Sequence, residues 1–472
     1  MDTNTTTGLI IAAGAGTRLN STAKTPKPLR KVSGLPLLKR IILTAHRGGL
    51  KRIVIVVGFQ KERIMAYVKK NKWPVAIEFV DNPDWKRSNG LSVLAAKDVI
   101  KENFVLMMSD HIFDPQTLTN LVAHGLGPLK ACLAVDYKTH QIFDKDDATK
   151  VLVKDNKIVA IEKALVTYNA IDTGLFLLSP SIFKALDDAK KDGDASLSDG
   201  IRTLSNNGEM GVFDIGGAFW QDVDTPESLK QAERVLINAC RKPTDGIISR
   251  NFNRHISTAI SRHLVKLPLS ANQFTFFVLF MGLACGYLAS VGTYTTYLVA
   301  GILFKLTSIL DGVDGELSKL RLTSSKFGQW LDTICDNLTY IVFILGTIIN
   351  LYTQKYVYSH ILTGSAAFGL IMALGIIFWY VLHYSDSGSL LAIQKAFDTR
   401  KDLTLFSKIF FKAHFAIKRD FFSVVFLVFA ILGKPQWVLF STALAMNLTW
   451  ITILQQEISS RKRKKLQQPT EA

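Results

Sequence analysis

The feature that most constrains this 472-residue chain is a change in composition partway along it. Up to about Lys242, charged and apolar residues are mixed as in a soluble domain. After Ser270, long apolar runs are separated by short polar stretches. A chain of this length is too long for one ordinary core. We therefore expect two or three domains, with a soluble part first and a membrane part second.

Six apolar segments follow Ser270, and most approach the length that crosses a bilayer. A transmembrane helix needs about 20 predominantly apolar residues. The second and fifth segments are shorter, so we expect their helices to extend into polar flanks. The segments are Gln273–Ser290, Tyr297–Leu310, Leu331–Leu351, Leu362–Leu382, Phe421–Leu432 and Trp437–Leu454. The second half is therefore predicted to be all-α.

Positive charge is unevenly distributed between the connections of these segments. The loop Tyr384–Asp420 and the run Arg461–Lys465 are basic, whereas the loops near 291–296, 352–361 and 433–436 carry at most one Lys each. Cytoplasmic loops carry the excess of Lys and Arg. We predict a multi-pass protein of the cell membrane with six spans and both termini in the cytoplasm. The net charge of +17 would also suit nucleic acid, but the apolar second half favours membrane lipid and phosphorylated substrates.

The soluble half alternates strands with helices. Short apolar, often β-branched runs predict strands, and helical spacing predicts the segments between them. The predicted strands are Leu9–Ala13, Arg52–Val57, Val75–Val80 and Phe104–Met108, and the predicted helices include Leu37–His46 and Leu91–Val99. This alternation indicates an α/β, Rossmann-like domain whose mostly parallel sheet has helices on both faces. Ligands on such sheets bind at the carboxyl ends of strands.

Two turns in this half carry groups suited to phosphate. Gly14-Ala15-Gly16-Thr17-Arg18 follows the first strand and offers backbone N–H groups where side chains would block close approach. Pro26-Lys27-Pro28 places a lysine on a stiff loop. Arg18 and Lys27 could neutralise the α-phosphate and a leaving pyrophosphate, and Asp110 could bind Mg²⁺. Alone, such an acid is by default a helix cap or a solvated residue.

Together these residues resemble the sugar-phosphate nucleotidyltransferase family. The match covers about residues 8–235 and comprises Ile10 to Leu19, Pro26 to Leu29, Asp110 and Asp222 to Thr225. The resemblance implies that an alcohol phosphate attacks the α-phosphate of a nucleoside triphosphate and that pyrophosphate leaves. It implies nucleotide contacts for Ala12, Ala13, Gly14, Ala15, Gly16, Thr17, Asn89 and Gly90, catalytic charge stabilisation by Arg18 and Lys27, metal binding by Asp110 and Asp222, and acceptor contacts for Glu162, Lys163, Thr173 and Gly174.

Four aspartates stand at the ends of the second and third apolar segments. Asp311 and Asp314 are three residues apart, and Asp332 and Asp336 are four apart, so each pair shares one face of a helix. Uncompensated acids are costly there. One or two divalent cations that bind a diphosphate would compensate them. The alternative is that the acids merely cap helices at the membrane interface.

This spacing resembles the CDP-alcohol phosphotransferase signature over about residues 251–457. The matching residues are Asp311, Asp314, Gly315, Gly328, Asp332 and Asp336, while Ser318 and Lys319 replace the usual Ala and Arg. Lysine loses the bidentate phosphate contact of arginine at the donor site. The resemblance implies six transmembrane helices, metal on the four acids, release of CMP, and Asp336 as the base that deprotonates the attacking hydroxyl. Arg254, Arg262 and Asn272 would face the phosphate pocket or serve as interfacial anchors.

The fusion of the two domains indicates the nucleotide. Because the membrane domain consumes CDP-alcohols, the soluble domain should use CTP. This architecture resembles the bifunctional enzymes of di-myo-inositol phosphate synthesis. That resemblance implies formation of CDP-inositol from CTP and inositol-1-phosphate, followed by transfer of phosphoinositol to a second inositol-1-phosphate. We expect Mg²⁺ or Mn²⁺ at both sites, a linker at 236–250, a basic tail at 458–472, and a possible homodimer through the membrane domain.

Two other functions fit parts of the sequence. A phospholipid head-group enzyme would keep both reactions but transfer onto or from a lipid. The cations Arg254, Arg262, Arg321 and Lys326 favour a soluble phosphate acceptor instead. A transporter with a regulatory nucleotide-binding domain would also use intramembrane acids, but no pair of broken helices in inverted halves is evident. Release of CMP from a CDP-alcohol would exclude simple transport.

Overall fold

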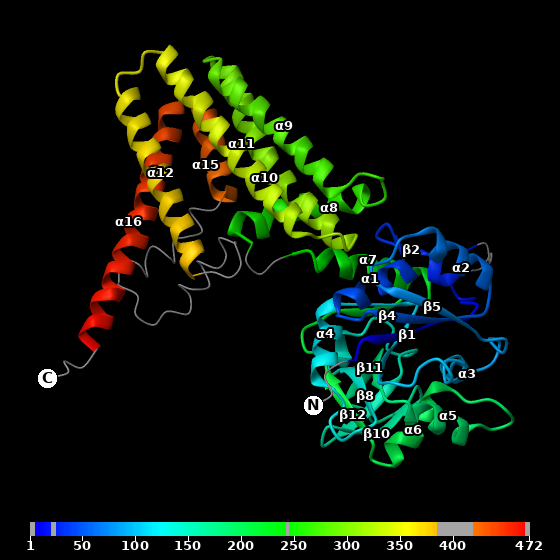
Figure 1. The fold of residues 1–472 in the computed structure, drawn as a ribbon. Coiled ribbons are helices and arrows are strands. Elements are labelled where there is room, and N and C mark those ends of the chain that lie inside the picture. Colours follow the sequence, from blue (N-terminus) through cyan, green and yellow to red (C-terminus); the bar gives the residue numbers. More distant parts are fainter. Residues whose placement is uncertain (1–4, 20–24, 242–244, 385–418, 468–472) are drawn as a thin grey trace. The chain divides into compact units, whose positions relative to one another are not determined.

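A computed structural model describes residues 5–19, 25–241, 245–384 and 419–467 (Figure 1). The chain divides into two compact units. An α/β unit comprises Met1–Cys240 with Lys319–Thr323, and a helical unit comprises Arg241–Ser318 with Ser324–Ala472. This confirms the predicted fold classes. Most of the basic loop Tyr384–Asp420, which contributed to the predicted topology, lies outside the described residues.

A nine-stranded mixed sheet forms the centre of the α/β unit. Its strand order is β5 (Ala76–Asp81), β4 (Arg52–Val57), β1 (Thr7–Ala12), β6 (Phe104–Met108), β11 (Ala170–Leu178), β8 (Ala131–Asp136), β12 (Met210–Asp214), β10 (Lys157–Glu162) and β9 (Lys150–Lys154). Strands β5, β4, β1 and β6 are parallel, as predicted, and β8 pairs with β12 in parallel. Strand β11 runs antiparallel to its neighbours, and the short turn between β9 and β10 forces a hairpin.

Helices connect the strands and cover both faces of the sheet (Figure 1). They are α1 (Leu37–Arg47), α2 (Lys61–Lys70), α3 (Asn89–Leu94), α4 (Pro115–His124), α5 (Ser181–Ala189), α6 (Leu197–Asn206) and α7 (Pro226–Asn238). Helix α3 ends before the predicted Val99, because the chain there makes successive turns with i to i+3 hydrogen bonds, such as Ala96 N to Val93 O. Helix α7 continues past residue 235, where the first domain was expected to end.

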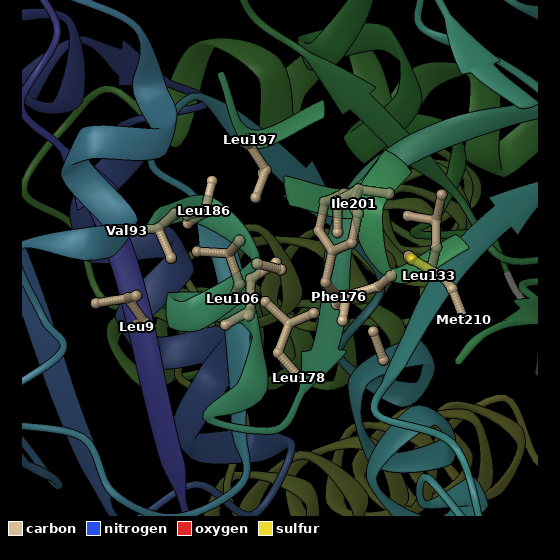
Figure 2. Close-up of a cluster of buried hydrophobic side chains, with 14 of the residues drawn as sticks. Leu9, Val93, Leu106, Leu133, Phe176, Leu178, Leu186, Leu197, Ile201 and Met210 are labelled. Atoms are coloured by element: carbon tan, nitrogen blue, oxygen red, sulfur yellow. The ribbon is translucent and has the colours of Figure 1, made fainter. Parts of the chain in front are cut away.

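The strands are apolar throughout because both faces of the sheet are buried. In β1, Leu9 and Ile11 point into the core on one face of the sheet. Figure 2 shows Leu9 in this core together with Leu106 and Phe176. Ile10 and Ala12 point into a second core on the other face. This double burial explains why the predicted strands read as continuous apolar runs rather than as alternating patterns.

The helical unit begins with a short π-helical segment, η3, and continues with long helices. The elements are η3 (Ser249–Asn253), α8 (Arg254–Leu264), α9 (Ala271–Ser290), α10 (Tyr294–Leu320), α11 (Lys326–Thr353), α12 (Ser359–Tyr384), α15 (Arg419–Ile431) and α16 (Pro435–Gln467). Each predicted apolar segment lies within one of the helices from α9 to α16, except that Leu432, the last residue of the fifth segment, follows the end of α15. Helix α16 runs through the basic residues Arg461–Lys465, so that part of the predicted tail is helical.

Within the part of the chain that the structure describes, four helices are long and apolar enough to cross a membrane. They are Ala271–Ser290, Tyr294–Leu320, Lys326–Thr353 and Pro435–Gln455, while Ser359–Ala373 and Asp420–Ile431 form shorter apolar helices. A capping box between Ser270 and Gln273 marks the start of α9. Aromatic residues from several helices, including Phe304, Phe343 and Phe426, form a buried core.

Candidate active sites

The glycine loop after β1 packs against the lysine loop. Gly16 has a φ of +58°, and a Cβ placed on it would lie 2.6 Å from the Cβ of Lys27. Only glycine tolerates both conditions. A Cβ on Gly14 would meet no described atom within 4 Å. Gly16 thus allows Lys27 to approach closely, while Gly14 leaves room for a ligand at the carboxyl end of β1.

Lys27 is buried between two carboxylates. It opens a short 3-10 helix between Pro26 and Pro28, and its Nζ lies 2.6 Å from Asp110 Oδ2 and also contacts Asp224 Oδ1. Burial lowers the pKa of Lys27, but the two carboxylates outweigh this effect and raise the pKa overall. Lys27 therefore remains positively charged in the place where the sequence predicts phosphate.

Arg18 joins the same network from a more exposed position. Its guanidinium lies 2.5 Å from Asp224 Oδ2 and 2.6 Å from Asp147 Oδ2. Asp147 also pairs with Lys163 Nζ at 2.7 Å. The hydrogen bond to Asp147 raises the pKa of Arg18. One carboxylate thus connects Arg18, predicted to act on the nucleotide, with Lys163, predicted to contact the acceptor. Exposed ion pairs of this kind are worth about 0–1 kcal/mol, so a substrate phosphate can replace Asp147.

A small two-stranded sheet brings together the two predicted metal ligands. Strand β7 (His111–Phe113) pairs with β13 (Trp220–Asp222), and His111 lies opposite Asp222. Burial opposes ionisation of Asp110, but Lys27 and His111 lower the pKa of its carboxyl group. Burial, together with Asp224 and Asp110, raises the pKa of Asp222. Carboxylates that repel each other in this way are a donor set that suits a divalent cation.

Two pockets meet at Asp110. The first has a volume of about 200 Å³, and its lining includes Gly14, Gly16, Lys27, Trp85, Asn89 and Asp110. The second has a volume of about 240 Å³, and its lining includes Asn89, Asp110, His111, Asp147, Lys163, Asp172, Gly174 and Asp222. The phosphate-binding loop faces the first pocket, and two of the predicted acceptor residues face the second. Adjoining pockets of this kind suit a nucleotide and an alcohol phosphate.

The other residues predicted to contact substrates differ in their burial and in their partners. Gly90 is buried, and a Cβ on it would lie 2.4 Å from Ala195 O, so it permits packing. Thr173 Oγ1 donates to Ala134 O at 2.8 Å, and Glu162 pairs with Arg202 at 3.0 Å. Ala12 and Ala13 are buried at the end of β1, Ala15 is half-buried, and Thr17 lines a third pocket with Arg18.

The second pocket also contains residues that the sequence analysis did not assign. His111 Nδ1 lies 2.7 Å from Asp110 Oδ1, and its ring stacks on Trp220 with centroids 6.3 Å apart. Gly174, at a φ of +74°, lets the imidazole approach, since a Cβ there would lie 2.7 Å from the ring. Burial raises the pKa of Asp172 to about 6. Of these, His111 could have been found as the residue directly after Asp110.

The helical unit brings together three of its four predicted acids. One oxygen from each of Asp311, Asp332 and Asp336 lies within 4.8 Å of the others. A close set of carboxylate oxygens suits a hard divalent cation. Asp314 is buried and its Oδ2 accepts a hydrogen bond from Thr275 Oγ1 at 2.5 Å.

The other residues that were predicted for the membrane site occupy different surroundings. A Cβ on Gly328 would lie 3.4 Å from Asn272 Oδ1, which places Asn272 beside the start of α11. A Cβ on Gly315 would meet no described atom within 4 Å, which leaves space beside the acids. Lys319 stands in the last turn of α10, and Arg262 is exposed in the last turn of α8.

Arg254 differs from the other predicted cations because it is buried in ion pairs. Its Nε and Nη2 lie 2.8 and 2.9 Å from the carboxylate of Asp245, and its Nη1 lies 2.7 Å from Glu316 Oε1. Its side chain is only 10% exposed. The guanidinium thus donates its hydrogen bonds to groups within the protein. The sequence analysis had considered a contact with substrate phosphate for this residue.

Each unit matches a known family. Residues 8–206 match the MobA-like NTP transferase domain, and residues 269–455 match the CDP-alcohol phosphatidyltransferase family. Enzymes of these families use divalent metal ions. The fold and the two sites therefore define a membrane enzyme that is both a nucleotidyltransferase and a CDP-alcohol phosphotransferase.

Most of the chain is similar to proteins that are named as bifunctional enzymes. The chain is 36% identical over 341 residues to the bifunctional IPC transferase and DIPP synthase of Aquifex aeolicus, which covers 72% of this chain and 76% of the relative. It is also 36% identical over 332 residues to the protein of that name from Thermococcus kodakarensis, covering 70% and 72%. The chain belongs to this family of bifunctional IPC transferases and DIPP synthases. A solved inositol-1-phosphate CTP transferase of T. maritima is 26% identical, with a TM-score of 0.45 over 49% of this chain and 96% of that chain.

Proposed function

We propose that the α/β unit converts CTP and inositol-1-phosphate into CDP-inositol and pyrophosphate. The helical unit then transfers the phosphoinositol group to a second inositol-1-phosphate and releases CMP. The observation that carries the proposal is the presence, in one chain, of the paired pockets beside Lys27 and the carboxylate cluster of Asp311, Asp332 and Asp336. The two activities in the names of the relatives support it.

In the first reaction, a phosphate oxygen of inositol-1-phosphate attacks the α-phosphorus of CTP, and the bond to the bridging pyrophosphate oxygen breaks. Backbone N–H groups near Gly14 bind phosphate. Arg18 and Lys27 neutralise charge on the α-phosphate and on the leaving pyrophosphate. Asp110 and Asp222 would bind Mg²⁺ or Mn²⁺, which supplies Lewis acidity when bound.

In the second reaction, a hydroxyl of the acceptor inositol-1-phosphate attacks the phosphorus that carries inositol in CDP-inositol, and the bond to CMP breaks. Asp336 accepts the proton of that hydroxyl. Asp311, Asp314 and Asp332 would complete the binding site for Mg²⁺ or Mn²⁺. Lys319, Arg262 and Asn272 would contact the phosphates of donor and acceptor.

For the membrane arrangement, we infer that α12 and α15 complete six spans and that both termini are cytoplasmic. We also propose that the nucleotidyltransferase domain spans residues 8–235 and that the transmembrane domain spans residues 251–457. Membrane lipid would contact the exposed apolar side chains of the long helices, such as Phe280 and Trp330, which are 67% and 62% exposed. A homodimer would form through this unit.

Mass spectrometry of the products tests the function. Membranes containing the full chain are mixed with CTP, Mg²⁺ and inositol-1-phosphate. We expect CDP-inositol and pyrophosphate first, then CMP and a phosphorylated di-inositol phosphate. A lipid-linked product would instead support a phospholipid head-group enzyme. Absence of CDP-inositol, with another CDP-alcohol formed from its own phosphate, would contradict the inositol assignment.

A further inference from the structure

A polar face joins α8 to α10, the helix that carries two of the acids. Its first side consists of Asn253, the last residue of η3, and Arg254, Ser257 and Ser261 of α8, which are all buried. Their spacing places them along one side of the helix. Buried helix faces usually contact one another through apolar residues, so a continuous polar contact here requires specific partners on α10.

Helix α10 presents a matching row of residues at helical spacing. Lys305 Nζ donates to Asn253 Oδ1 at 2.9 Å, and Asn253 Nδ2 donates to Ser308 O at 3.4 Å. One turn further along, Arg254 Nη1 donates to Gly312 O at 3.4 Å. A Cβ on Gly312 would lie 2.7 Å from that same nitrogen. A side chain at this position would therefore displace the Arg254 guanidinium from its place between the two helices.

Glu316 is the centre of this contact. Its carboxylate is 1% exposed and accepts hydrogen bonds from Arg254 Nη1 at 2.7 Å, from Ser257 Oγ at 2.7 Å and from Ser261 Oγ at 2.6 Å. Asp245 binds the remaining side of the Arg254 guanidinium. A charged carboxylate can be buried only where such partners compensate for the lost water. Its hydrogen bonds to them are directional. Apolar contacts would permit sliding, whereas these bonds require one rotation and one depth of α10.

Asp311 and Asp314 lie on the far side of α10 from Glu316, about 140° and 160° around the helix. One residue along an α-helix corresponds to a rotation of about 100°, so a small error in the rotation of α10 would separate its acids from those of α11. We propose that Glu316 is a positioning residue for phosphoalcohol transfer, fixing α10 so that Asp311 meets Asp332 and Asp336 at metal-binding distance. This inference rests on the proposed metal-dependent function of the cluster. Arg254 then acts as the partner of Glu316.

The test compares variants of the full chain in lipid nanodiscs. Glu316→Gln removes the buried charge but keeps the size, and Ser261→Ala removes a single hydrogen bond. The Mg²⁺ concentration for half-maximal CMP release from supplied CDP-inositol is the main readout. Groups that orient metal ligands typically contribute 10–100-fold to metal affinity. We expect Glu316→Gln to raise that Mg²⁺ concentration by about 10-fold or more, with excess Mg²⁺ recovering part of the rate, and Ser261→Ala to shift it less in the same direction.

Two internal controls make the result specific. His263→Gln changes an exposed residue of the same helix and should leave the Mg²⁺ dependence unchanged. CDP-inositol formation by the α/β unit should be unchanged in every variant. Wild-type Mg²⁺ dependence in folded Glu316→Gln protein would overturn the proposal, even if thermal stability fell. If Glu316→Gln does not fold, unchanged Mg²⁺ dependence in Ser261→Ala overturns it. Failure of the wild-type chain to release CMP would instead refute the proposed function.

Discussion

Among single residues, Lys27 tests whether the two reactions use separate sites. Lys27→Ala removes the cation between Asp110 and Asp224. We expect CDP-inositol formation to fall by roughly 10²–10³-fold, as after loss of other transition-state charge contacts. Transfer from supplied CDP-inositol should be unchanged. Pyrophosphate and CMP release are measured on the same preparation, with the exposed Lys72→Ala as a matched control. Loss of both activities in a folded protein would contradict separate sites.

Asp336 and Asp311 belong to the same cluster but have different proposed roles. Asp336→Asn keeps an oxygen that binds metal weakly but cannot accept a proton. We expect donor binding with Mg²⁺ to remain near that of the wild type while transfer falls by roughly 10²–10⁴-fold, the usual share of general base catalysis. Asp311→Asn should weaken donor binding instead, and excess Mg²⁺ should recover part of its rate. Indistinguishable donor affinity and Mg²⁺ dependence would remove the special role of Asp336.

Asp172 predicts a pH dependence of stability. Burial raises its pKa to about 6, and its Oδ1 accepts a hydrogen bond from Gly174 N at 2.7 Å. An unfolded Asp titrates near about pH 4. Between these values the folded chain binds more protons, so the free energy of unfolding falls as pH rises through the window. Asp172→Asn keeps the acceptor and cannot ionise. It should therefore be more stable than the wild type at pH 7, by at most about 3 kcal/mol.

Hydrogen exchange of the β11 amides at pH 4 and pH 7 measures this difference. The stability gain of Asp172→Asn should be present at the higher pH and absent at the lower one. If the wild-type chain is as stable as the variant at pH 7, ionised Asp172 costs no stability and the prediction is wrong.

The residues that could be predicted from the sequence share a local signal. Gly14 and Asp110 directly follow apolar strands, and such positions bind ligands in α/β folds. Partners distant in sequence carry no such signal. Arg18 reaches Asp147 and Asp224 across 129 and 206 residues, and only the folded chain brings these groups together. The same limit explains why the burial of Arg254 in an ion pair was not foreseen.

At the scale of helices, α9 and α11 approach closely where Gly286 and Gly346 meet. A Cβ on Gly346 would lie 2.1 Å from Gly286 O. Since α11 carries Asp332 and Asp336, Gly346→Ala should displace it, slow CMP release and lower the temperature of half-inactivation by several degrees. Overpacking of this kind costs about 1–3 kcal/mol. Gly364→Ala on α12 is the matched control, because no described atom lies within 4 Å.

The control should retain or gain stability, since alanine favours helix over glycine by about 1 kcal/mol. Thermal inactivation curves of CMP release compare the two variants directly. Equal curves would mean that α11 does not depend on this contact for its position.

The elements that were predicted correctly follow from strong periodic patterns. Each predicted apolar run coincides with a helix, and four of the described helices are long and apolar enough to cross a membrane. The second apolar segment ends at Leu310, and α10 continues to Leu320 through polar turns that carry the acids, which confirms the expected extension of this helix into a polar flank. The antiparallel strands β9 and β10 were not predicted, because their side chains are only partly buried. Their place in the sheet depends on the strand order, which local sequence patterns do not reveal.

At the scale of the whole molecule, the change in composition near residue 250 predicted two units with separate cores, and the structure has them. Each unit contains its own set of residues for its reaction. The first product is the second substrate, and it is a small, soluble compound. Nothing in either reaction therefore requires that both steps take place on the same chain.

This independence predicts complementation between two inactive variants. Lys27→Ala protein should consume CDP-inositol but form none, and Asp336→Asn protein should form it and accumulate it. Mixed in detergent with CTP, Mg²⁺ and inositol-1-phosphate, they should restore the final product, after a lag that shortens as more Asp336→Asn protein is added. Isotope-labelled inositol-1-phosphate follows the intermediate through both stages. If each variant keeps its remaining activity and the mixture still yields no final product, CDP-inositol must pass between the two sites of a single chain without release.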